Sequence, residues 1–537
     1  MDEAEEGLRS APAMEALVAE VMSWSPSDRL DYFRKFPDEE VYRIHDEIER
    51  HTIRANPVEW AERTFKTRLW ASQRDILESV IRDPDTEDVY VQSCHGAGKT
   101  YTSSLVALTF LHAYQYSRIL TTAPTFRQVK HVLWQELRAA HTVSGLRGEA
   151  NLTELKIEDK WYALGFSVND ENAFQGHHGD YILVIFDEAC GIDKMIWNGA
   201  EGVLSSGHAR ALRVGNPTDA NTEFYKGCKN TAPSNKRITI SAFDTPNFTN
   251  FGITEEDIEL GTWVDKLDGR PLPRPYLVQP AWVAKRFKAW GKNSALYRSR
   301  VLGQFPEGGD DTLISLAHID RAANTDLKKD YSVIEFGQDV AYFGNDENVI
   351  AMRIGGFVRI IGRWRGQDTV ESAESAVYNI RKANIDYGLN LTDDQLKKLP
   401  IKVDVIGYGA GVADTLLKMG WNAIRVNVAE GALDPEKYKN WRAECFWNVR
   451  DRFWENNIDI DPEDEELQLQ LSAIKYKIPG GRIQIFEKGD IKKLIGRSPD
   501  DVDAVVLAFA PTREMNVVAT FGDADNELTK ASMWSNV

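Results

Sequence analysis

The chain has 537 residues, of which 42% are hydrophobic and 27% charged, and its formal net charge is −18. This length exceeds one ordinary core and predicts two or three globular domains. The chain contains no run of about 18 apolar residues, so we expect no membrane span. Its start does not resemble a signal peptide, and its four cysteines are scattered, so we expect a cytosolic protein without disulfides or a zinc site. Because affinity for nucleic acid depends on neutralising phosphates, an acidic chain would bind it only through local basic patches or within a larger assembly.

The first half of the chain alternates between two patterns. Residues 1–60 are charged and helical in pattern, with prolines as breaks. From about residue 60 to 250, short apolar or β-branched runs alternate with helical patterns such as Thr125–Ala140. This alternation predicts a parallel sheet flanked by helices, followed by a helix over 281–302. The predicted strands are 89–93, 117–122, 181–187, 211–215 and 237–242.

A phosphate-binding loop follows the first predicted strand. Its sequence is Ser-Cys-His-Gly-Ala-Gly-Lys-Thr, with serine in place of the usual first glycine. The two glycines allow a tight turn whose N–H groups point at phosphate oxygens, the lysine reaches the β/γ-phosphates, and the threonine hydroxyl binds Mg²⁺. The helix that follows adds the positive end of its dipole. The predicted nucleotide-binding residues here are Ser93, Cys94, His95, Gly96, Ala97, Gly98, Lys99 and Thr100.

Two acids end the apolar run Tyr181–Phe186. At the carboxyl end of a strand, Asp187 is predicted to bind the Mg²⁺ shell and Glu188 to polarise the attacking water. An apolar strand ending in two acids is also common without this chemistry. The position of this pair after a phosphate loop favours the catalytic interpretation.

Two further residues are predicted to contact the nucleotide. Gln73 lies just upstream of the loop and can read the adenine edge, although a place on a surface helix would also explain it. Asn216 ends another predicted strand and could sense the γ-phosphate. Its alternative role is a turn residue before Pro217.

The second half follows a different pattern. Strands are predicted at 332–340, 348–354 and 357–364, joined by tight turns at Gly344-Asn345 and Gly355-Gly356, which indicates an antiparallel meander. A helix over 369–387 and a strand over 401–406 follow. We expect five segments: 1–60 helical, 61–304 with the parallel sheet and lid helices, 305–328 a linker, 329–515 a mixed sheet with helices, and 516–537 a tail.

Four acids of the second half are predicted to form a second site. Asp339 lies on the first strand, Asp404 on the fourth, and Asp500 and Asp503 share a face at the start of the last helix. A ribonuclease-H-like domain brings these positions together to hold two divalent ions roughly 4 Å apart. Alternatively, Asp500 and Asp501 could be helix N-caps. Asp404 interrupts an apolar run, where a carboxylate is costly without a metal or partner.

Basic residues cluster near this predicted site and offer a candidate DNA-facing surface. A run of charge is more often simply solvated. The cluster comprises Lys475, Lys477, Arg482, Lys488, Lys492, Lys493 and Arg497.

Taken in this order, the motifs resemble the large terminase subunit of tailed bacteriophages over residues 60–515. The resemblance implies an α/β protein with an N-terminal P-loop ATPase domain and a C-terminal ribonuclease-H-like nuclease domain. The residues that carry it are Trp70 and Gln73, the phosphate loop, Phe174–His178, Asp187 and Glu188, Gly215–Pro217, Gly337–Ala341, Val403–Asp414 and Ser498–Ala504.

The resemblance implies an ATP-driven motor that docks on the portal protein of an empty capsid, pumps in double-stranded DNA and cuts the concatemer. It implies ATP with Mg²⁺ in the first site and Mg²⁺ or Mn²⁺ in the nuclease site. It also implies a small terminase subunit as partner and a homo-oligomeric ring, expected to be a pentamer, working in the host cytoplasm and absent from the mature virion. The implied roles are Lys99 and Thr100 as nucleotide and Mg²⁺ ligands, Glu188 as base, Asn216 as coupling residue, and Asp339, Asp404 and Asp503 as metal ligands with Asp500 nearby.

One departure concerns the positive charge of the loop. Many relatives carry an arginine there, where this chain has Cys94 and His95. An arginine supplied by a neighbouring subunit is expected, with Arg127, Arg138 and Arg147 as candidates.

Two other functions would also account for a phosphate loop in this chain. A helicase or translocase without nuclease activity predicts a second nucleotide-binding pattern downstream, and none occurs in the sequence. A structural docking protein with a vestigial loop is disfavoured because Lys99, Thr100, Asp187 and Glu188 are all retained.

Overall fold

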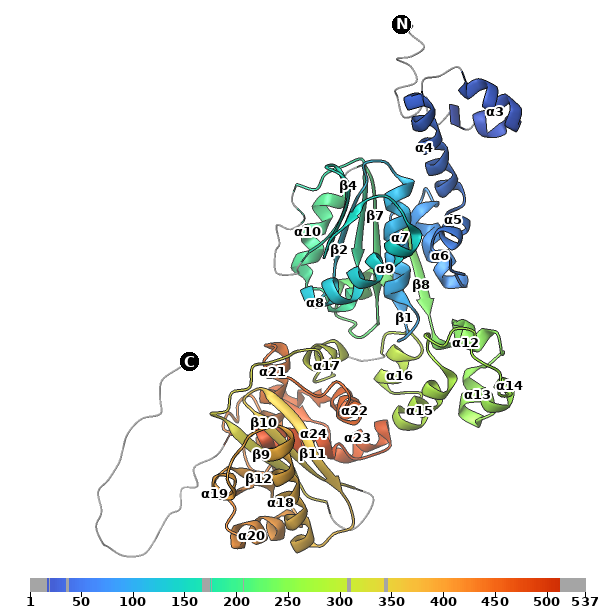
Figure 1. The fold of residues 1–537 in the computed structure, drawn as a ribbon. Coiled ribbons are helices and arrows are strands. Elements are labelled where there is room, and N and C mark those ends of the chain that lie inside the picture. Colours follow the sequence, from blue (N-terminus) through green and yellow to red (C-terminus); the bar gives the residue numbers. More distant parts are fainter. Residues whose placement is uncertain are drawn as a thin grey trace, which may run out of the picture.

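The computed structural model describes residues 17–18, 20–34, 38–166, 174, 176–205, 207–306, 311–341 and 346–511. The predicted turn at Gly344-Asn345, the motif residue Gln175 and the predicted tail 516–537 lie outside them. Two separate sheets, each with its own helices, organise the chain (Figure 1). In the part that the structure describes, no helix has the length and apolar character needed to cross a membrane.

The described residues of the N-terminal segment form helices, as its charge pattern predicts. Pro26 and Pro57 stand at the first position of a helix, where the missing N–H is not needed for an intrahelical bond. Arg54 donates a hydrogen bond to the Ala113 carbonyl at 2.8 Å, which ties this segment to the first sheet's central helix. The helices are α3 (Pro26–Phe33), α4 (Asp38–Ala55), α5 (Pro57–Thr64) and α6 (Ala71–Ile81).

The first sheet has eight strands in the order β3-β4-β5-β2-β6-β7-β1-β8. Its last six strands are parallel, and β3 and β4 extend the β5 edge in antiparallel fashion. All five predicted strands are present, whereas the sequence analysis did not identify the β3–β5 edge. The strands are β1 (Asp88–Ser93), β2 (Arg118–Thr122), β3 (Glu149–Ala150), β4 (Glu154–Glu158), β5 (Trp161–Gly165), β6 (Tyr181–Phe186), β7 (His208–Gly215) and β8 (Asn235–Ile240).

Helices cover both faces of this sheet. The helix after the phosphate loop, α7, is buried almost all round because it packs against the sheet on one side and other helices on the other. The predicted helix Thr125–Ala140 is present but contains a π-helical turn, Val129–Leu133, between α8 and α9. The elements are α7 (Lys99–Ala113), α8 (Phe126–Gln128), α9 (Trp134–Ser144), α10 (Lys194–Leu204) and α11 (Glu223–Lys229).

Small helices follow β8 and connect the two sheets. The helical stretch predicted over 281–302 is present but consists of two helices: it breaks at Gly291, which ends α15 with φ 74°, and Ser294 caps the next helix by accepting from Tyr297 N. The helices are α12 (Pro246–Thr249), α13 (Glu255–Leu260), α14 (Trp263–Leu267), α15 (Pro280–Trp290), α16 (Ala295–Arg300) and α17 (Leu316–Ala323).

The second sheet has five strands in the order β11-β10-β9-β12-β13. β9, β10 and β11 form the predicted antiparallel meander, and β12 and β13 run parallel to β9. Helix α24 packs on β9 and β10. This order, with the last helix on the first strand, confirms the predicted ribonuclease-H-like arrangement. The strands are β9 (Ile334–Asp339), β10 (Asn348–Ile354), β11 (Phe357–Trp364), β12 (Ile401–Asp404) and β13 (Ala423–Val426).

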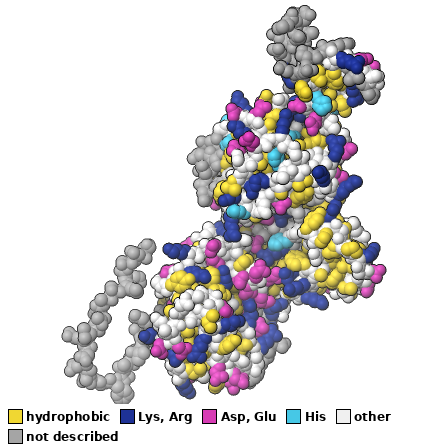
Figure 2. Space-filling model, in the orientation of Figure 1, with side chains coloured by type: hydrophobic (Ala, Val, Ile, Leu, Met, Phe, Trp, Pro, Cys, Tyr) yellow, Lys and Arg dark blue, Asp and Glu magenta, His cyan; other side chains and the backbone are white. Residues whose placement is uncertain are grey.

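Further helices and a small hairpin complete the second half. The helices are α18 (Thr369–Asp386), α19 (Asp393–Leu396), α20 (Gly409–Lys418), α21 (Trp441–Trp454), α22 (Glu465–Ala473), α23 (Lys488–Ile495) and α24 (Asp500–Phe509). The hairpin pairs β14 (Tyr476–Lys477) with β15 (Gln484–Ile485). On the face shown in Figure 2, acidic and basic side chains are interspersed, and acidic side chains gather where the two halves meet.

Candidate functional site

The phosphate loop lies at the carboxyl end of β1, where β1 passes into α7. Gly96 and Gly98 both take the left-handed conformation, with φ of 65° and 77°, which glycine adopts without strain. A side chain at Gly96 would also crowd the backbone of Val278, whose N–H donates to the Gly96 carbonyl at 2.9 Å. The loop predicted from the sequence is therefore formed, and it is held in place by the segment that leads into α15.

The Lys99 side chain lies close to Asn216 and Glu188, two residues predicted to share its site. Its Nζ donates to Asn216 Oδ1 at 3.0 Å and lies 3.6 Å from Glu188 Oε1. Asn216 in turn donates to the Ser93 carbonyl at 2.6 Å. β7, which ends one residue before Asn216, lies between β1 and β6, and this strand order brings the three side chains together.

Asp187 and Thr100 form the second part of this cluster. Thr100 Oγ1 donates to Asp187 Oδ2 at 3.2 Å, whereas Asp187 Oδ1 is buried without a hydrogen-bond partner. Burial, and then the neighbouring Glu188, raise the pKa of Asp187 to about 7, although Lys99 and Thr100 act in the opposite direction. An unpaired buried carboxylate oxygen beside a threonine hydroxyl fits a Mg²⁺ site, because Mg²⁺ prefers oxygen ligands and compensates buried negative charge. Glu188 adopts φ 49°, an uncommon backbone conformation for a glutamate at a strand end.

Two of the other predicted nucleotide contacts, Gln73 and Cys94, are buried. Gln73 is buried and donates to Thr102 Oγ1 at 3.0 Å, while its own oxygen accepts from Trp70 N. Burial raises the pKa of the Cys94 thiol to about 12, despite Lys99 nearby. His95 is half-buried and lines the cavity described below, and burial followed by the Arg300 and Lys99 charges lowers its pKa.

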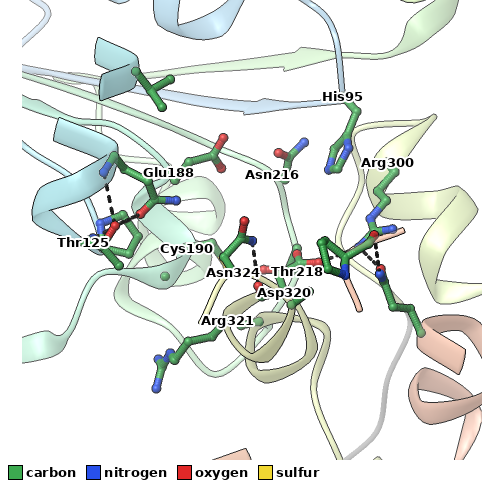
Figure 3. Close-up of a pocket in the computed structure, with 18 of the residues that line it drawn as sticks. His95, Thr125, Glu188, Cys190, Asn216, Thr218, Arg300, Asp320, Arg321 and Asn324 are labelled. Carbon is green, nitrogen blue, oxygen red and sulfur yellow. Dashed lines mark hydrogen bonds and ion pairs between the residues drawn. The ribbon is translucent and has the colours of Figure 1, made fainter. Parts of the chain in front are cut away.

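A cavity of about 610 Å³ opens beside this cluster (Figure 3). Thr100, Glu188 and Asn216 line it from the first sheet, and Arg300 and Asp320 line it from α16 and α17. Residues of α22 and of the loop before it complete the wall from the second half of the chain. The volume is in the range of small-molecule and cofactor sites. No local sequence pattern indicates Arg300 or Asp320, because both reach the cavity only through the tertiary fold.

Three of the four predicted acids of the second half contact one lysine. Asp339 ends β9, Asp404 ends β12, and Asp500 and Asp503 lie in the first turn of α24. The Nζ of Lys488 lies 3.2 Å from Asp339 Oδ2, 2.8 Å from Asp503 Oδ2 and 3.7 Å from Asp500 Oδ1. Lys488 begins α23, and the sequence analysis assigned it only to the basic cluster.

The electrostatics of this cluster reflect crowded carboxylates. Burial raises the pKa of Asp339 to about 8; Lys488 opposes the rise, and Asp503, Asp500 and Asp404 add to it. Burial is also the main cause that raises the pKa of Asp404, and Asp503 contributes. Among the described residues no three His, Cys, Asp or Glu side chains are arranged as a ready metal site. In this cluster the Lys488 ammonium contacts three of the carboxylates instead. The donor set itself, several carboxylates on three elements, suits Mg²⁺ or Mn²⁺.

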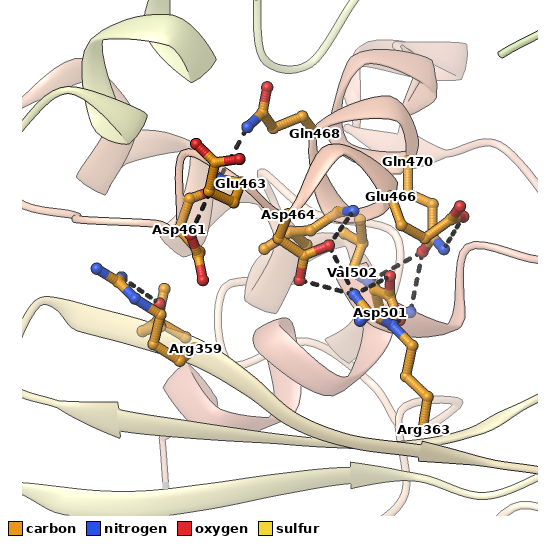
Figure 4. A network of polar contacts seen from close by, with 12 residues as sticks. Arg359, Arg363, Asp461, Glu463, Asp464, Glu466, Gln468, Gln470, Asp501 and Val502 are labelled. Carbon is orange, nitrogen blue, oxygen red and sulfur yellow. Dashed lines mark hydrogen bonds and ion pairs between the residues drawn. The ribbon is translucent and has the colours of Figure 1, made fainter. Parts of the chain in front are cut away.

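The N-cap alternative for Asp500 and Asp501 is wrong. Pro499 is the capping residue of α24 and makes no side-chain cap. Asp500 accepts from Glu347 N at 3.0 Å, and Asp501 is buried in a paired contact with Arg363 (Figure 4). Arg363, which also pairs with Asp464, thus joins β11 to the start of α24 and fixes the helix end that presents the acids.

The basic cluster of the sequence is largely paired with acids. Lys475 contacts Asp311, Lys492 contacts Asp346, Lys493 contacts Asp490 and Arg497 contacts Glu466. Lys488 alone of these lies at the acid cluster. These ion pairs favour the alternative that most of the cluster is ordinary surface charge and not a DNA-facing surface.

The three candidate arginines of the first half differ in their surroundings. Arg147 pairs with Asp46 and lies 4.5 Å over the Trp161 ring, and Arg138 donates to the Leu152 carbonyl. Arg127 is exposed. None of the three lines the cavity.

Comparison with known proteins finds similarity to large terminase subunits. No family model matches. A protein of Enterobacteria phage P7 described as a probable terminase large subunit is 23% identical over 493 residues, which cover 86% of this chain and 93% of that protein. The chain is a homologue of a terminase large subunit.

Solved structures of large terminases are similar to both halves. The large terminase of the thermophilic bacteriophage D6E is 12% identical, with a TM-score of 0.38, over 82% of this chain and 98% of that one. The terminase nuclease domain of bacterial virus Sf6 is 18% identical, with a TM-score of 0.30, over 37% of this chain and 98% of that one. The fold assignment here rests on the strand orders of the chain itself.

Proposed function

We propose that this chain is the large subunit of a viral DNA-packaging terminase: an ATPase that drives double-stranded DNA into a procapsid and a nuclease that cuts the concatemer. The observation that carries the proposal is the presence of two chemically distinct clusters in one chain, Lys99 with Asp187, Glu188 and Asn216, and Asp339 with Asp404, Asp500 and Asp503. The terminase homologue in phage P7 supports the same conclusion.

In the ATPase site, each side chain has a role that its position supports. Lys99 would neutralise the β/γ-phosphates, and Asn216, hydrogen-bonded to Lys99, would register whether the γ-phosphate is present. Glu188 lies at the cavity wall and would orient and polarise the attacking water. Thr100 and Asp187 would hold Mg²⁺, which supplies charge neutralisation of the phosphates when bound. Gln73 and the residues Ser93–Gly98 remain proposed nucleotide contacts.

In the nuclease site, Asp339, Asp404, Asp500 and Asp503 would hold Mg²⁺ or Mn²⁺. Such ions activate the attacking water and stabilise the leaving oxygen of a phosphodiester. The residues themselves supply an acidic, largely buried surface, and Lys488 neutralises it in the absence of cations. Because the Lys488 ammonium contacts three of the acids, it must either move away when cations bind or share these carboxylates with the cations.

The wider assembly is part of the proposal. We place the ATPase domain at 61–304, a linker at 305–328 and the nuclease domain at 329–515, after an N-terminal helical segment 1–60. The partners would be double-stranded DNA, the portal protein, the small terminase subunit and further copies of the chain in a pentameric ring, working in the host cytoplasm. A helicase or translocase without nuclease activity would leave the acid cluster around Lys488 unexplained.

The proposal is tested with the purified full-length chain in two assays. We expect ATP hydrolysis that rises on addition of double-stranded DNA, and plasmid cleavage that requires Mn²⁺ or Mg²⁺ and stops with EDTA. Hydrolysis without cleavage at any divalent ion would favour the translocase alternative. Absence of both activities would contradict the proposal.

A further inference from the structure

Arg300 is attached directly to the phosphate loop. It ends α16, and its carbonyl accepts a hydrogen bond from His95 N at 2.9 Å. Only 9% of its side chain is exposed, and it lines the cavity together with Glu188 and Asn216. Arg300 therefore belongs to the wall of the proposed nucleotide site, and a movement of its backbone would move the loop.

The guanidinium of Arg300 uses only part of its hydrogen-bonding capacity. Its Nη2 donates to Asp320 Oδ1 at 2.5 Å and to Gln468 Oε1 at 2.9 Å. Its Nε is buried and has no hydrogen-bond partner among the described residues. Since an arginine offers five N–H donors in a planar fork, this group retains the capacity to bind a second anion.

Two carboxylates already lie near Arg300 in the cavity wall. Burial and the nearby Glu188 raise the pKa of Asp320, and the Arg300 charge opposes that rise. Asp320 and Glu188 thus lie within electrostatic reach of each other across the cavity. A triphosphate placed beside Lys99 would add negative charge to this space, and Asp320 would then compete with it for the same guanidinium.

We propose that Arg300 is a second phosphate-binding cation of the ATPase site and that it exchanges Asp320 for the terminal phosphate when a nucleoside triphosphate binds. The inference rests on the proposed binding of ATP beside Lys99. Arginine–phosphate contacts are charge-assisted and often bidentate, so a triphosphate can outcompete one carboxylate oxygen. A diphosphate lacks the group that would make the exchange.

The exchange would connect the nucleotide to the second half of the chain. Asp320 belongs to α17 and Gln468 to α22, and the Arg300 contacts fasten both to the phosphate loop. Binding of a triphosphate would loosen this attachment, and loss of the terminal phosphate would restore it.

Arg321 provides a matched control. It is the next residue along α17 after Asp320, yet it is exposed and donates to Asn456 Oδ1 at 2.9 Å. In Figure 3 its side chain extends away from Arg300. Arg321→Gln removes one positive charge near the cavity without touching the proposed exchange.

The test measures dissociation constants for a fluorescent non-hydrolysable ATP analogue and for fluorescent ADP. With Arg300→Gln we expect at least tenfold weaker binding of the ATP analogue and less than a twofold change for ADP. With Asp320→Asn we expect tighter binding of the analogue, because its competitor is gone, and Arg321→Gln should match the unmodified chain.

The double variant Arg300→Gln with Asp320→Asn decides the mechanism. It carries neither buried charge, so it avoids the unpaired carboxylate that could unfold the single variant. If the exchange occurs, Asp320→Asn brings no gain once Arg300 is absent. Equal losses for both nucleotides, or a gain from Asp320→Asn that persists in the double variant, would overturn the inference. Failure of the unmodified chain to bind either nucleotide would instead refute the proposed ATPase function itself.

Discussion

Gly337 permits the contact on which the nuclease cluster depends. It lies in β9, two residues before Asp339, and faces α24 near Asp503. A Cβ at this position would lie 2.2 Å from the Ala504 carbonyl oxygen and 2.2 Å from Ala508 N, both backbone atoms. Gly337→Ala therefore cannot be accommodated by a side-chain rotation.

The expected magnitude follows from this geometry. Because real Cβ atoms essentially never approach within 3.0 Å of another heavy atom, α24 must retreat from β9 by about 1 Å. Overpacking of this kind costs about 1–3 kcal/mol, which corresponds to a fall in melting temperature of roughly 2–4 °C per kcal/mol for a domain of this size. Misplacing reactive groups by about 1 Å can cost around 100-fold in rate. Cleavage should thus fall far more than stability.

The assay compares Mn²⁺-dependent plasmid cleavage, ATP hydrolysis and thermal unfolding. Gly337→Ala should lose cleavage by about 100-fold and retain ATP hydrolysis. Gly431→Ala is the control, since a Cβ there meets nothing within 4 Å. Unchanged cleavage and melting temperature in Gly337→Ala would refute the reasoning that α24 and β9 are held at backbone contact.

Two further predictions concern the first half. Burial lowers the pKa of His112 to about 4, against about 6.5 when unfolded, so the unfolded state binds the proton and stability is lost as pH falls from about 6.5 towards 4. His112→Leu should remove about 2 kcal/mol of the stability difference between pH 7 and pH 5 in denaturant titrations; an unaltered pH dependence would contradict this. Asn216→Ala removes the acceptor of Lys99 and the donor to Ser93, and ATP hydrolysis should fall roughly 10- to 100-fold with cleavage unchanged. Full hydrolysis by this variant would exclude Asn216 from the site.

The sequence predicted those parts of the fold that short-range patterns determine. The loop at Gly96–Thr100 and the buried strands have strong local signatures, and their order sufficed to predict both sheets. β3 and β4 were not identified because they are short and polar where they face solvent, as at Glu149. β5 is apolar but only five residues long, which makes its pattern weak. The helix over 281–302 was predicted as one piece because the role of Gly291 as a helix end was not recognised.

The residues of the candidate sites also differ in whether a local sequence pattern could identify them. Lys99, Asp187 and Asp339 follow strand ends and could be chosen from the sequence. Lys488 and Arg300 could not, because each reaches its site from a helix distant in the chain. Their positions depend on how α23 and α16 pack, which no local pattern of residues encodes.

The central claim is that one chain holds two independent catalytic sites. The most direct test measures ATP hydrolysis and Mn²⁺-dependent plasmid cleavage side by side for Lys99→Ala and Asp339→Ala. Lys99→Ala should abolish hydrolysis and retain cleavage, and Asp339→Ala should abolish cleavage and retain hydrolysis. Loss of both activities in either correctly folded variant, or retention of cleavage by Asp339→Ala, would contradict the assignment.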